Sequence, residues 1–148
     1  MIYLGADHGG YALKEKIKAH LTSKKIAVSD QGAFDEQPSD YPDYAFAVAE
    51  KVRDGGADDF GILVCNTSIG TCVAANKIKG VRAAVGYTEH AVVQARDHVD
   101  ANVLCLGAEE IDHDAALAMV EIFLNTQFSG DERHVRRLSK IQQREQEE

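Results

Sequence analysis

The residue whose type and setting best fit a chemical role is a cysteine at the end of an apolar run. Cys65 closes the run 61–65, and Asn-Thr-Ser-Ile-Gly follows at 66–70. We expect a buried strand that delivers the thiol to the start of a helix, where free backbone N–H groups gather. Such groups can lower the pKa of a thiol and can hold an anion. The pattern favours catalysis, although buried structural cysteines are also common.

A second polar group follows the first apolar run of the chain. Asp7 and His8 precede the pair Gly9-Gly10. A carboxylate and a titratable imidazole can bind hydroxyl groups and move protons, and two glycines let a ligand approach the backbone closely. The simpler alternative is a helix N-cap at Asp7 beside a surface histidine.

A basic segment lies near the C-terminal end of an acidic chain. Arg133 and Arg137 are four residues apart, so a helix would place them on one face, beside His134. These side chains could clamp a phosphate, or they could form a solvated face paired with acidic residues. His98 lies just before an apolar run, at the wrong edge of a sheet for its own cleft, so it could serve the cleft of a neighbouring subunit.

Apolar strand-like runs alternate with segments of helical period along the chain. We expect strands over 1–5, 26–30, 60–65, 81–85 and 103–106, and helices over 11–23, 41–54, 67–78, 88–97 and 112–125, the last capped by Asp112. The alternation predicts a single α/β domain, with a doubly wound five-stranded parallel sheet between two helical layers and a basic C-terminal helix and charged tail over about 130–148. A strand order of 2-1-3-4-5 would place the loops after the first and third strands in one cleft.

Composition excludes several classes of partner. The chain has 148 residues and a formal net charge of −8, which disfavours nucleic acid and anionic membranes as partners. No apolar run approaches the roughly 20 residues of a membrane span, and the N-terminal residues do not resemble a signal peptide. Three cysteines without a CxxC pair favour a reducing cytoplasm.

Several familiar site patterns are absent from the sequence. Neither GxGxxG nor GxxxxGK[ST] occurs, so dinucleotide and nucleoside-triphosphate binding are unsupported. A Cys-x5-Arg phosphatase motif fails because position 71 is Thr71. No group of His, Cys and carboxylate residues has the spacing of metal ligands.

Six motifs in order resemble one family of sugar-phosphate enzymes. They are Asp7-His8-Gly9-Gly10, Asp40-Tyr41-Pro42, Cys65-x-Thr67-x-Ile69-Gly70, Ala74-Ala75-Asn76-Lys77, His98-x-Asp100-Ala101-Asn102-Val103-Leu104 and Arg133-His134-x-x-Arg137. From Met1 to about Ile141 the chain resembles ribose-5-phosphate isomerase type B, in the family that also holds the galactose-6-phosphate isomerase subunits. The resemblance implies a Rossmann-like fold, a homodimer or dimer of dimers, no metal or cofactor, and aldose–ketose interconversion of a sugar phosphate through an enediolate.

The resemblance also implies a role for each matching residue. Cys65 would move a proton between C1 and C2 with help from Thr67, backbone N–H groups of 66–70 would stabilise the enediolate, and His98 of a partner subunit would open the sugar ring. The expected substrate-binding residues are Asp7, His8, Tyr41, Asn66, Ser68, Ile69, Gly70, Val99, Arg133, His134 and Arg137.

Four departures from the family pattern fall mainly on the substrate side. Asn66 and Ser68 stand where the family usually has glycine, and both side chains could enter the pocket. Val99 replaces a usual asparagine and Glu109 a usual arginine, and the segment 130–133 is one residue longer. Three alternatives stay open: an isomerase of another tetrose, pentose or hexose or of its phosphate, a non-catalytic partner subunit of the same family, and an unrelated thiol enzyme such as a hydrolase.

Overall fold

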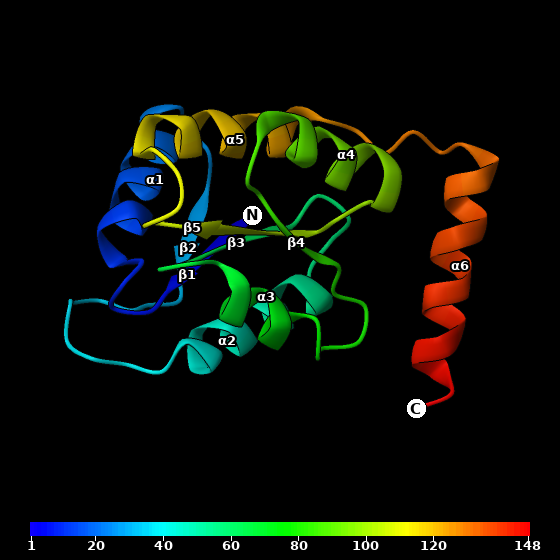
Figure 1. The fold of residues 1–148 in the computed structure, drawn as a ribbon, viewed down its shortest axis with the longest axis horizontal. Helices are drawn as coiled ribbons and strands as arrows, with labels where there is room; N and C mark the ends of the chain where they lie inside the picture. Colours follow the sequence, from blue (N-terminus) through cyan, green and yellow to red (C-terminus); the bar gives the residue numbers. More distant parts are fainter.

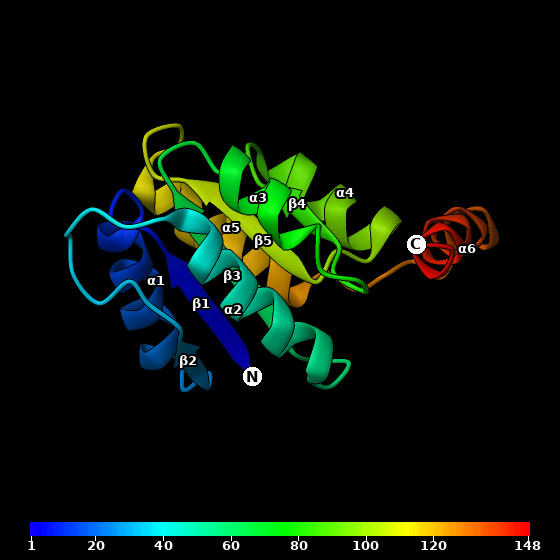
Figure 2. The same cartoon turned by 90° about the horizontal axis from the view of Figure 1, so that it is seen from below.

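Five parallel strands form the central sheet of the computed structural model, which describes residues 1–148. The strands are β1 (Ile2–Ala6), β2 (Val28–Asp30), β3 (Phe60–Cys65), β4 (Ala83–Val85) and β5 (Val103–Gly107). The helices are α1 (Tyr11–Ser23), α2 (Tyr41–Asp54), α3 (Ile69–Ala75), α4 (Glu89–Val99), α5 (His113–Asn125) and α6 (Glu132–Gln146). Helices α1, α4 and α5 cover one face of the sheet, α2 and α3 cover the other, and α6 stands to one side (Figures 1 and 2). The predicted three-layer Rossmann-like fold is confirmed.

The strand order differs from the expected 2-1-3-4-5. The sheet runs β2-β1-β3-β5-β4, so that prediction was wrong for the last two strands. β5 is buried along its whole length and pairs with β3 through five residues, whereas β4 has three half-buried residues and takes the edge. An edge strand pairs with a neighbour on one side only, so this position suits a short, partly exposed strand. β1 and β3 remain neighbours, and the loops that follow them still meet.

The core consists of two apolar layers, one on each face of the sheet. In β3, Ile62 and Val64 pack towards α1, α4 and α5, while Leu63 packs towards α2 and α3. Successive side chains of a strand point to opposite faces, which is why an uninterrupted apolar run is needed here. The same alternation turns Cys65 towards the α2–α3 layer.

The ranges of two helices and of β3 were predicted to the residue, whereas the other elements are shifted by one to three residues at one end or at both. The predicted helices 11–23 and 41–54 are confirmed, as is the cap at Asp112, whose carboxylate accepts the Asp114 and Ala115 N–H groups at 3.0 and 3.2 Å. The helix expected over 67–78 is shorter, at Ile69–Ala75, because Ser68 before it has a left-handed backbone. No helix has the length and apolar character needed to cross a bilayer.

A fully buried lysine ties α1 to the end of β2. The Lys14 ammonium donates to Asp30 Oδ1 at 2.8 Å and to the Ala33 carbonyl. Asp30 also accepts from Lys18 Nζ at 2.7 Å and from the Gly32 N–H at 2.9 Å. Burial by itself would raise the pKa of Asp30, but these donors hold it below its usual value.

We predict that Lys14→Met lowers the free energy of unfolding by about 2 kcal/mol at neutral pH, because it takes from the largely buried Asp30 carboxylate one of its two ammonium partners. A carboxyl group with a lowered pKa stabilises the fold above its unfolded pKa of about 3.9, and the contribution is lost as the pH falls through its folded pKa. Urea unfolding should therefore show a gap between wild type and variant that is full at pH 7 and shrinks below about pH 4. Lys16→Met, at an exposed position of the same helix, is the control, and an equal loss there would contradict the prediction.

Candidate active site

The Cys65 thiol lies at the carboxyl end of β3 and is held by two groups. The Ser68 N–H donates to Cys65 Sγ at 3.1 Å, and Thr71 Oγ1 lies 3.5 Å from the same sulfur. The Thr71 hydroxyl donates its only hydrogen to the Ser68 carbonyl at 3.1 Å, so its oxygen is free to accept the S–H. Cys65 is 5% exposed, which places the thiol just beneath the surface. Sequence reasoning missed Thr71, because its contact depends on the turn between β3 and α3.

The loop after Cys65 presents unused backbone donors. The N–H groups of Asn66, Thr67, Ile69 and Gly70 donate to no acceptor within the chain. Ser68 makes this possible with φ 68° and ψ −19°, a left-handed conformation that costs a residue with a side chain about 1–2 kcal/mol. Free backbone donors beside a thiol form a site where negative charge on an oxygen can be stabilised.

Asn66 and Ser68, which stand where the family pattern has glycine, differ in where their side chains lie. Ser68 is 1% exposed and its hydroxyl donates to the Thr67 carbonyl, so its side chain folds back onto the backbone. The Asn66 side chain is half-buried and lies against Gly9, where an added Cβ would collide with its amide oxygen. Asn66 makes no side-chain hydrogen bond within the chain, which leaves its amide available to a ligand.

The loop after β1 meets the loop after β3, as expected. Gly10 lies so close to β3 that an added Cβ would collide with the Val64 carbonyl. Asp7 is 8% exposed, and its carboxylate accepts the Gly10 N–H at 3.1 Å. The N-cap of α1 is Gly10 rather than Asp7, so Asp7 fixes the turn in front of the helix. His8 is exposed beside it.

Tyr41 completes this group from the start of α2. Its ring lies over Gly70, where an added Cβ would be 2.7 Å from the ring Cζ. Tyr41 is 41% exposed, so part of it remains open to solvent. Three of the predicted site residues, Asp7, His8 and Tyr41, thus lie around the 65–70 loop, which itself carries Cys65 and Asn66.

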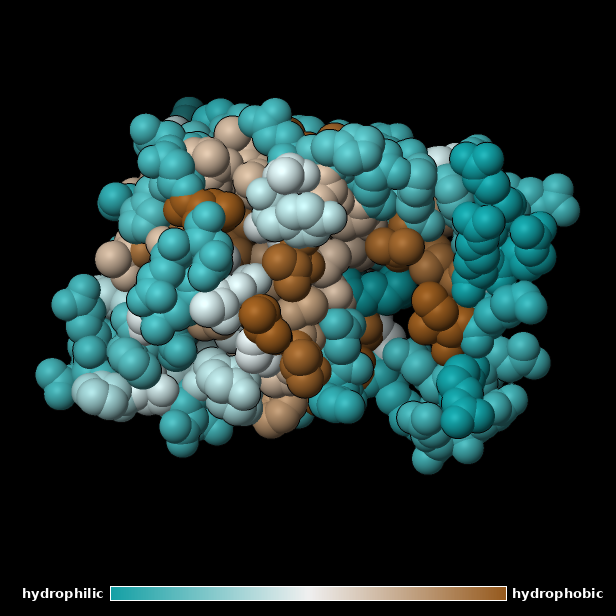
Figure 3. All heavy atoms as spheres, in the orientation of Figure 1, coloured by the Kyte–Doolittle hydropathy of each residue, from teal (hydrophilic) through white to brown (hydrophobic).

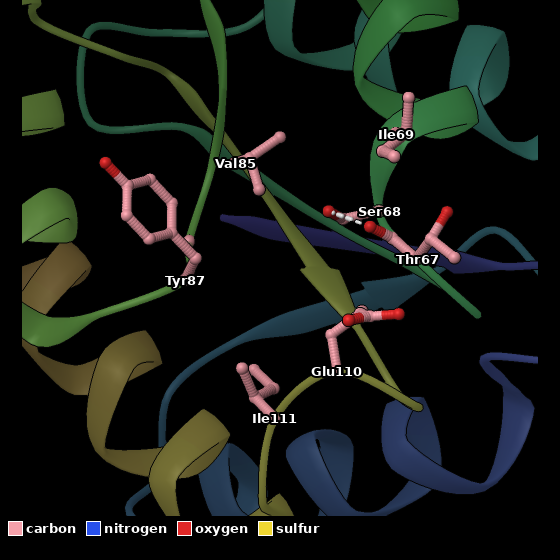
Figure 4. A pocket seen from close by; sticks show the side chains of 9 residues that line it. Thr67, Ser68, Ile69, Val85, Tyr87, Glu110 and Ile111 are labelled. Atoms are coloured by element: carbon pink, nitrogen blue, oxygen red, sulfur yellow. Dashed lines mark hydrogen bonds between the residues drawn. The ribbon is translucent and has the colours of Figure 1, made fainter.

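A cavity of about 420 Å³ lies on the other side of the same loop, at the ends of β3, β4 and β5 (Figure 4). It is lined by Thr67, Ser68, Ile69, Val85, Gly86, Tyr87, Gly107, Glu110 and Ile111. Of the predicted site residues, only three from the 65–70 loop reach it. Glu109 does not line it, and its backbone N–H instead donates to the Asn66 carbonyl at 3.0 Å.

The remaining predicted site residues form a second cluster around two histidines. The rings of His98 and His134 lie 4.2 Å apart between centroids, and Asp97 Oδ2 is 3.3 Å from His98 Nε2. Arg133 Nε donates to His134 Nε2 at 3.3 Å, so the His134 proton is on Nδ1, 2.7 Å from Ser129 Oγ. Burial first, and then the nearby His98 and Arg133, lower the pKa of His134.

The two clusters lie at opposite edges of the sheet. Val103, at the start of β5, is level with Gly61, and Gly107, at its end, is level with Cys65. His98 lies before the start of β5, whereas Cys65 is level with its end. The four residue steps along the strand, at about 3.3 Å each, correspond to roughly 13 Å between the two levels. The structure therefore does not bring His98, Arg133, His134 or Arg137 to the Cys65 of the same chain.

Helix α6 carries part of the second cluster and makes little contact with the rest of the chain (Figures 1 and 2). His134 is its only buried residue, and Val135 and Ile141 are 45% and 51% exposed. Apolar surface is visible beside α6 and also over α3 (Figure 3), where Ile69 and Val73 are 63% and 57% exposed. Arg137 forms no ion pair or hydrogen bond within the chain, and Val99 is 41% exposed.

Comparison with known proteins identifies close relatives over almost the whole chain. The family described as Ribose/Galactose Isomerase matches residues 2–141. A protein of Mycoplasma genitalium named "Probable ribose-5-phosphate isomerase B" is 43% identical over 147 residues, which cover 99% of this chain and 96% of the relative. The ribose-5-phosphate isomerase B structure from Clostridium thermocellum has a TM-score of 0.95 and 40% identity, covering 99% of this chain and 97% of that one. The Mycoplasma genitalium enzyme structure with bound ribulose-5-phosphate has a TM-score of 0.92 and 42% identity, with coverage of 99% and 97%.

Proposed function

The chain belongs to the ribose/galactose isomerase family, and on that premise we propose that it interconverts D-ribose 5-phosphate and D-ribulose 5-phosphate with Cys65 as the base. The activity of the family is aldose–ketose isomerisation. The relatives named for ribose 5-phosphate, and the related structure that holds ribulose-5-phosphate, support this choice of substrate. The observation that carries the proposal is the Cys65 thiol beside the unused N–H groups of the 66–70 loop.

The reaction moves one proton between adjacent carbons. The Cys65 thiolate takes the proton from C2 of the open-chain aldose, the C2–H electrons form the C1=C2 bond, and the carbonyl oxygen gains negative charge. The N–H groups of Asn66, Ile69 and Gly70 stabilise that oxygen in the enediolate. The thiol then returns the proton to C1, while the Thr67 hydroxyl carries the hydroxyl proton from O2 to O1. The Ser68 N–H holds the sulfur in place throughout.

Substrate binding is divided between the loops around Cys65. Asp7, His8 and Tyr41 hold the sugar, with Asp7 near the ring oxygen or the hydroxyl groups. The Asn66 amide, which has no partner in the chain, adds a contact from the floor of the cleft. Because its side chain fills space over Gly9, a tetrose, hexose or other pentose phosphate is the second candidate substrate.

The other half of the site comes from a second copy of the chain. In the proposed homodimer, or dimer of dimers, His98 of the partner protonates the ring oxygen during ring opening, Val99 borders the sugar, and Arg133, His134 and Arg137 hold the phosphate. Their separation from Cys65 within one chain supports this, and so do the exposed apolar residues of α3 and α6. The three free cysteines fit a cytoplasmic enzyme.

Purified protein assayed without any partner protein tests the proposal. We predict turnover of ribose 5-phosphate with a kcat/KM at least about 10³-fold above that for ribose, because phosphate binding holds the reacting carbons in place. Tetrose and hexose phosphates in the same panel test the second candidate. A folded protein that turns over none of these sugars would contradict the proposal and favour a non-catalytic subunit.

A further inference from the structure

A reciprocal pair of hydrogen bonds joins His8 to a residue 31 positions away. The His8 N–H donates to Ser39 Oγ at 3.1 Å, and the Ser39 N–H donates to His8 Nδ1 at 3.1 Å. Ser39 is half-buried in the connection 31–40 between β2 and α2, which crosses the carboxyl edge of the sheet (Figure 2). These two bonds fix both the backbone and the ring of His8.

The second bond determines where the imidazole carries its proton. A backbone N–H can only donate, so Nδ1 must accept with its lone pair. The hydrogen of the neutral ring is therefore on Nε2, the nitrogen on the side of the ring away from Ser39. This leaves Nε2 as a donor for an oxygen of a ligand.

We propose that Ser39 is a positioning residue, which holds His8 as the Nε2–H tautomer so that this hydrogen is offered to an oxygen of the bound sugar phosphate. The inference rests on the proposed function for the identity of the ligand. The tautomer and the anchoring of His8 do not depend on it.

The connection that carries Ser39 is anchored at both ends. At the near end, the Ala6 N–H donates to the Gly32 carbonyl at 2.7 Å, and buried Lys14 donates to the Ala33 carbonyl. At the far end, α2 begins at Tyr41, two residues after Ser39. Between them the connection is exposed, and Phe34 is 72% accessible. Ser39 thus lies next to the start of α2. The short segment 39–41 connects the residue that binds His8 to Tyr41.

Nitrogen-detected NMR of the histidine rings tests the tautomer without any turnover. We expect neutral His8, assigned by the loss of its signals in His8→Gln, to show a single Nε2–H form in the wild type. Ser39→Pro removes both bonds and should give a mixture of tautomers, whereas Ser39→Ala keeps the N–H donor and should retain the single form. A tautomer mixture in the wild type would overturn the inference even if the isomerase activity is found.

Kinetics separates positioning from a general loss of structure. Ser39→Pro should raise KM about 3–10-fold, the equivalent of one hydrogen bond, and change kcat less. In a His8→Gln background the same substitution should have no further effect on KM, since its target is already gone. Glu36→Pro is the control, because the Glu36 N–H makes no hydrogen bond, and it should leave KM unchanged. An equal KM increase with and without His8 would show that Ser39 acts only on the fold.

Discussion

Cys65→Ala is expected to lower kcat for ribose 5-phosphate at least about 10³-fold, with KM and the melting temperature near their wild-type values. Loss of a general base removes about 10²–10⁴ in rate, and no other group close to the sulfur can replace it. Ser68 and Thr71 contact the thiol, but one offers a backbone donor and the other an alcohol whose hydrogen is already bonded. Steady-state kinetics and thermal unfolding of the same preparation separate the catalytic loss from a folding defect.

Cys65→Ser sharpens the same prediction. A serine hydroxyl has nearly the same shape as the thiol and can accept a hydrogen bond from the Ser68 N–H. At neutral pH, however, it does not lose its proton, so it cannot act as the base. The two Cys65 variants should therefore be equally inactive, with Cys65→Ser the more stable. Cys72→Ser, at a half-buried thiol one helical turn into α3, is the matched control and should keep full activity. Turnover at the wild-type rate in either Cys65 variant would remove the thiol from the mechanism.

The parts of the fold that the sequence predicted are those in which local pattern and final packing agree. The α1 and α2 ranges follow from apolar residues at helical spacing, and the full β3 range follows from an apolar run bounded by polar residues. The meeting of the Asp7 and Cys65 loops also followed, because β1 and β3 are neighbours in either strand order. What fixed this part of the site was the topology of parallel sheets, not contacts between individual residues.

The features that were missed depend on contacts between segments far apart in the chain. β5 pairs with β3 through five residues and takes the place expected for β4, which has only three. No local pattern of residues 83–85 indicates this. The hydrogen bond between the Ser39 N–H and His8 Nδ1 joins residues 31 positions apart, and no pattern in the sequence links these two residues. The left-handed backbone of Ser68 runs against the preference of its own type, so the surrounding loop must impose it.

A mixture of two inactive variants is expected to recover activity. Cys65→Ala removes the base and His98→Ala removes the ring-opening acid, so each homodimer is inactive. If one chain supplies Cys65 and the other His98, a dimer of the two variants has one complete site and one doubly damaged site. Random pairing of equal amounts after co-expression makes half of the dimers mixed, so about a quarter of the wild-type activity should return.

The size of that recovery distinguishes a shared site from one built within a single chain. In the structure His98 is roughly 13 Å or more from the Cys65 edge of its own sheet, which is several times the length of a hydrogen bond. A chain carrying both substitutions, paired with wild type, is the control: a shared site leaves every mixed dimer inactive and about a quarter of the total activity, whereas a site within one chain leaves about half. No recovery in the first mixture together with half activity in the control would place the acid and the base in one subunit, and the proposed division of the site between two chains would then be wrong.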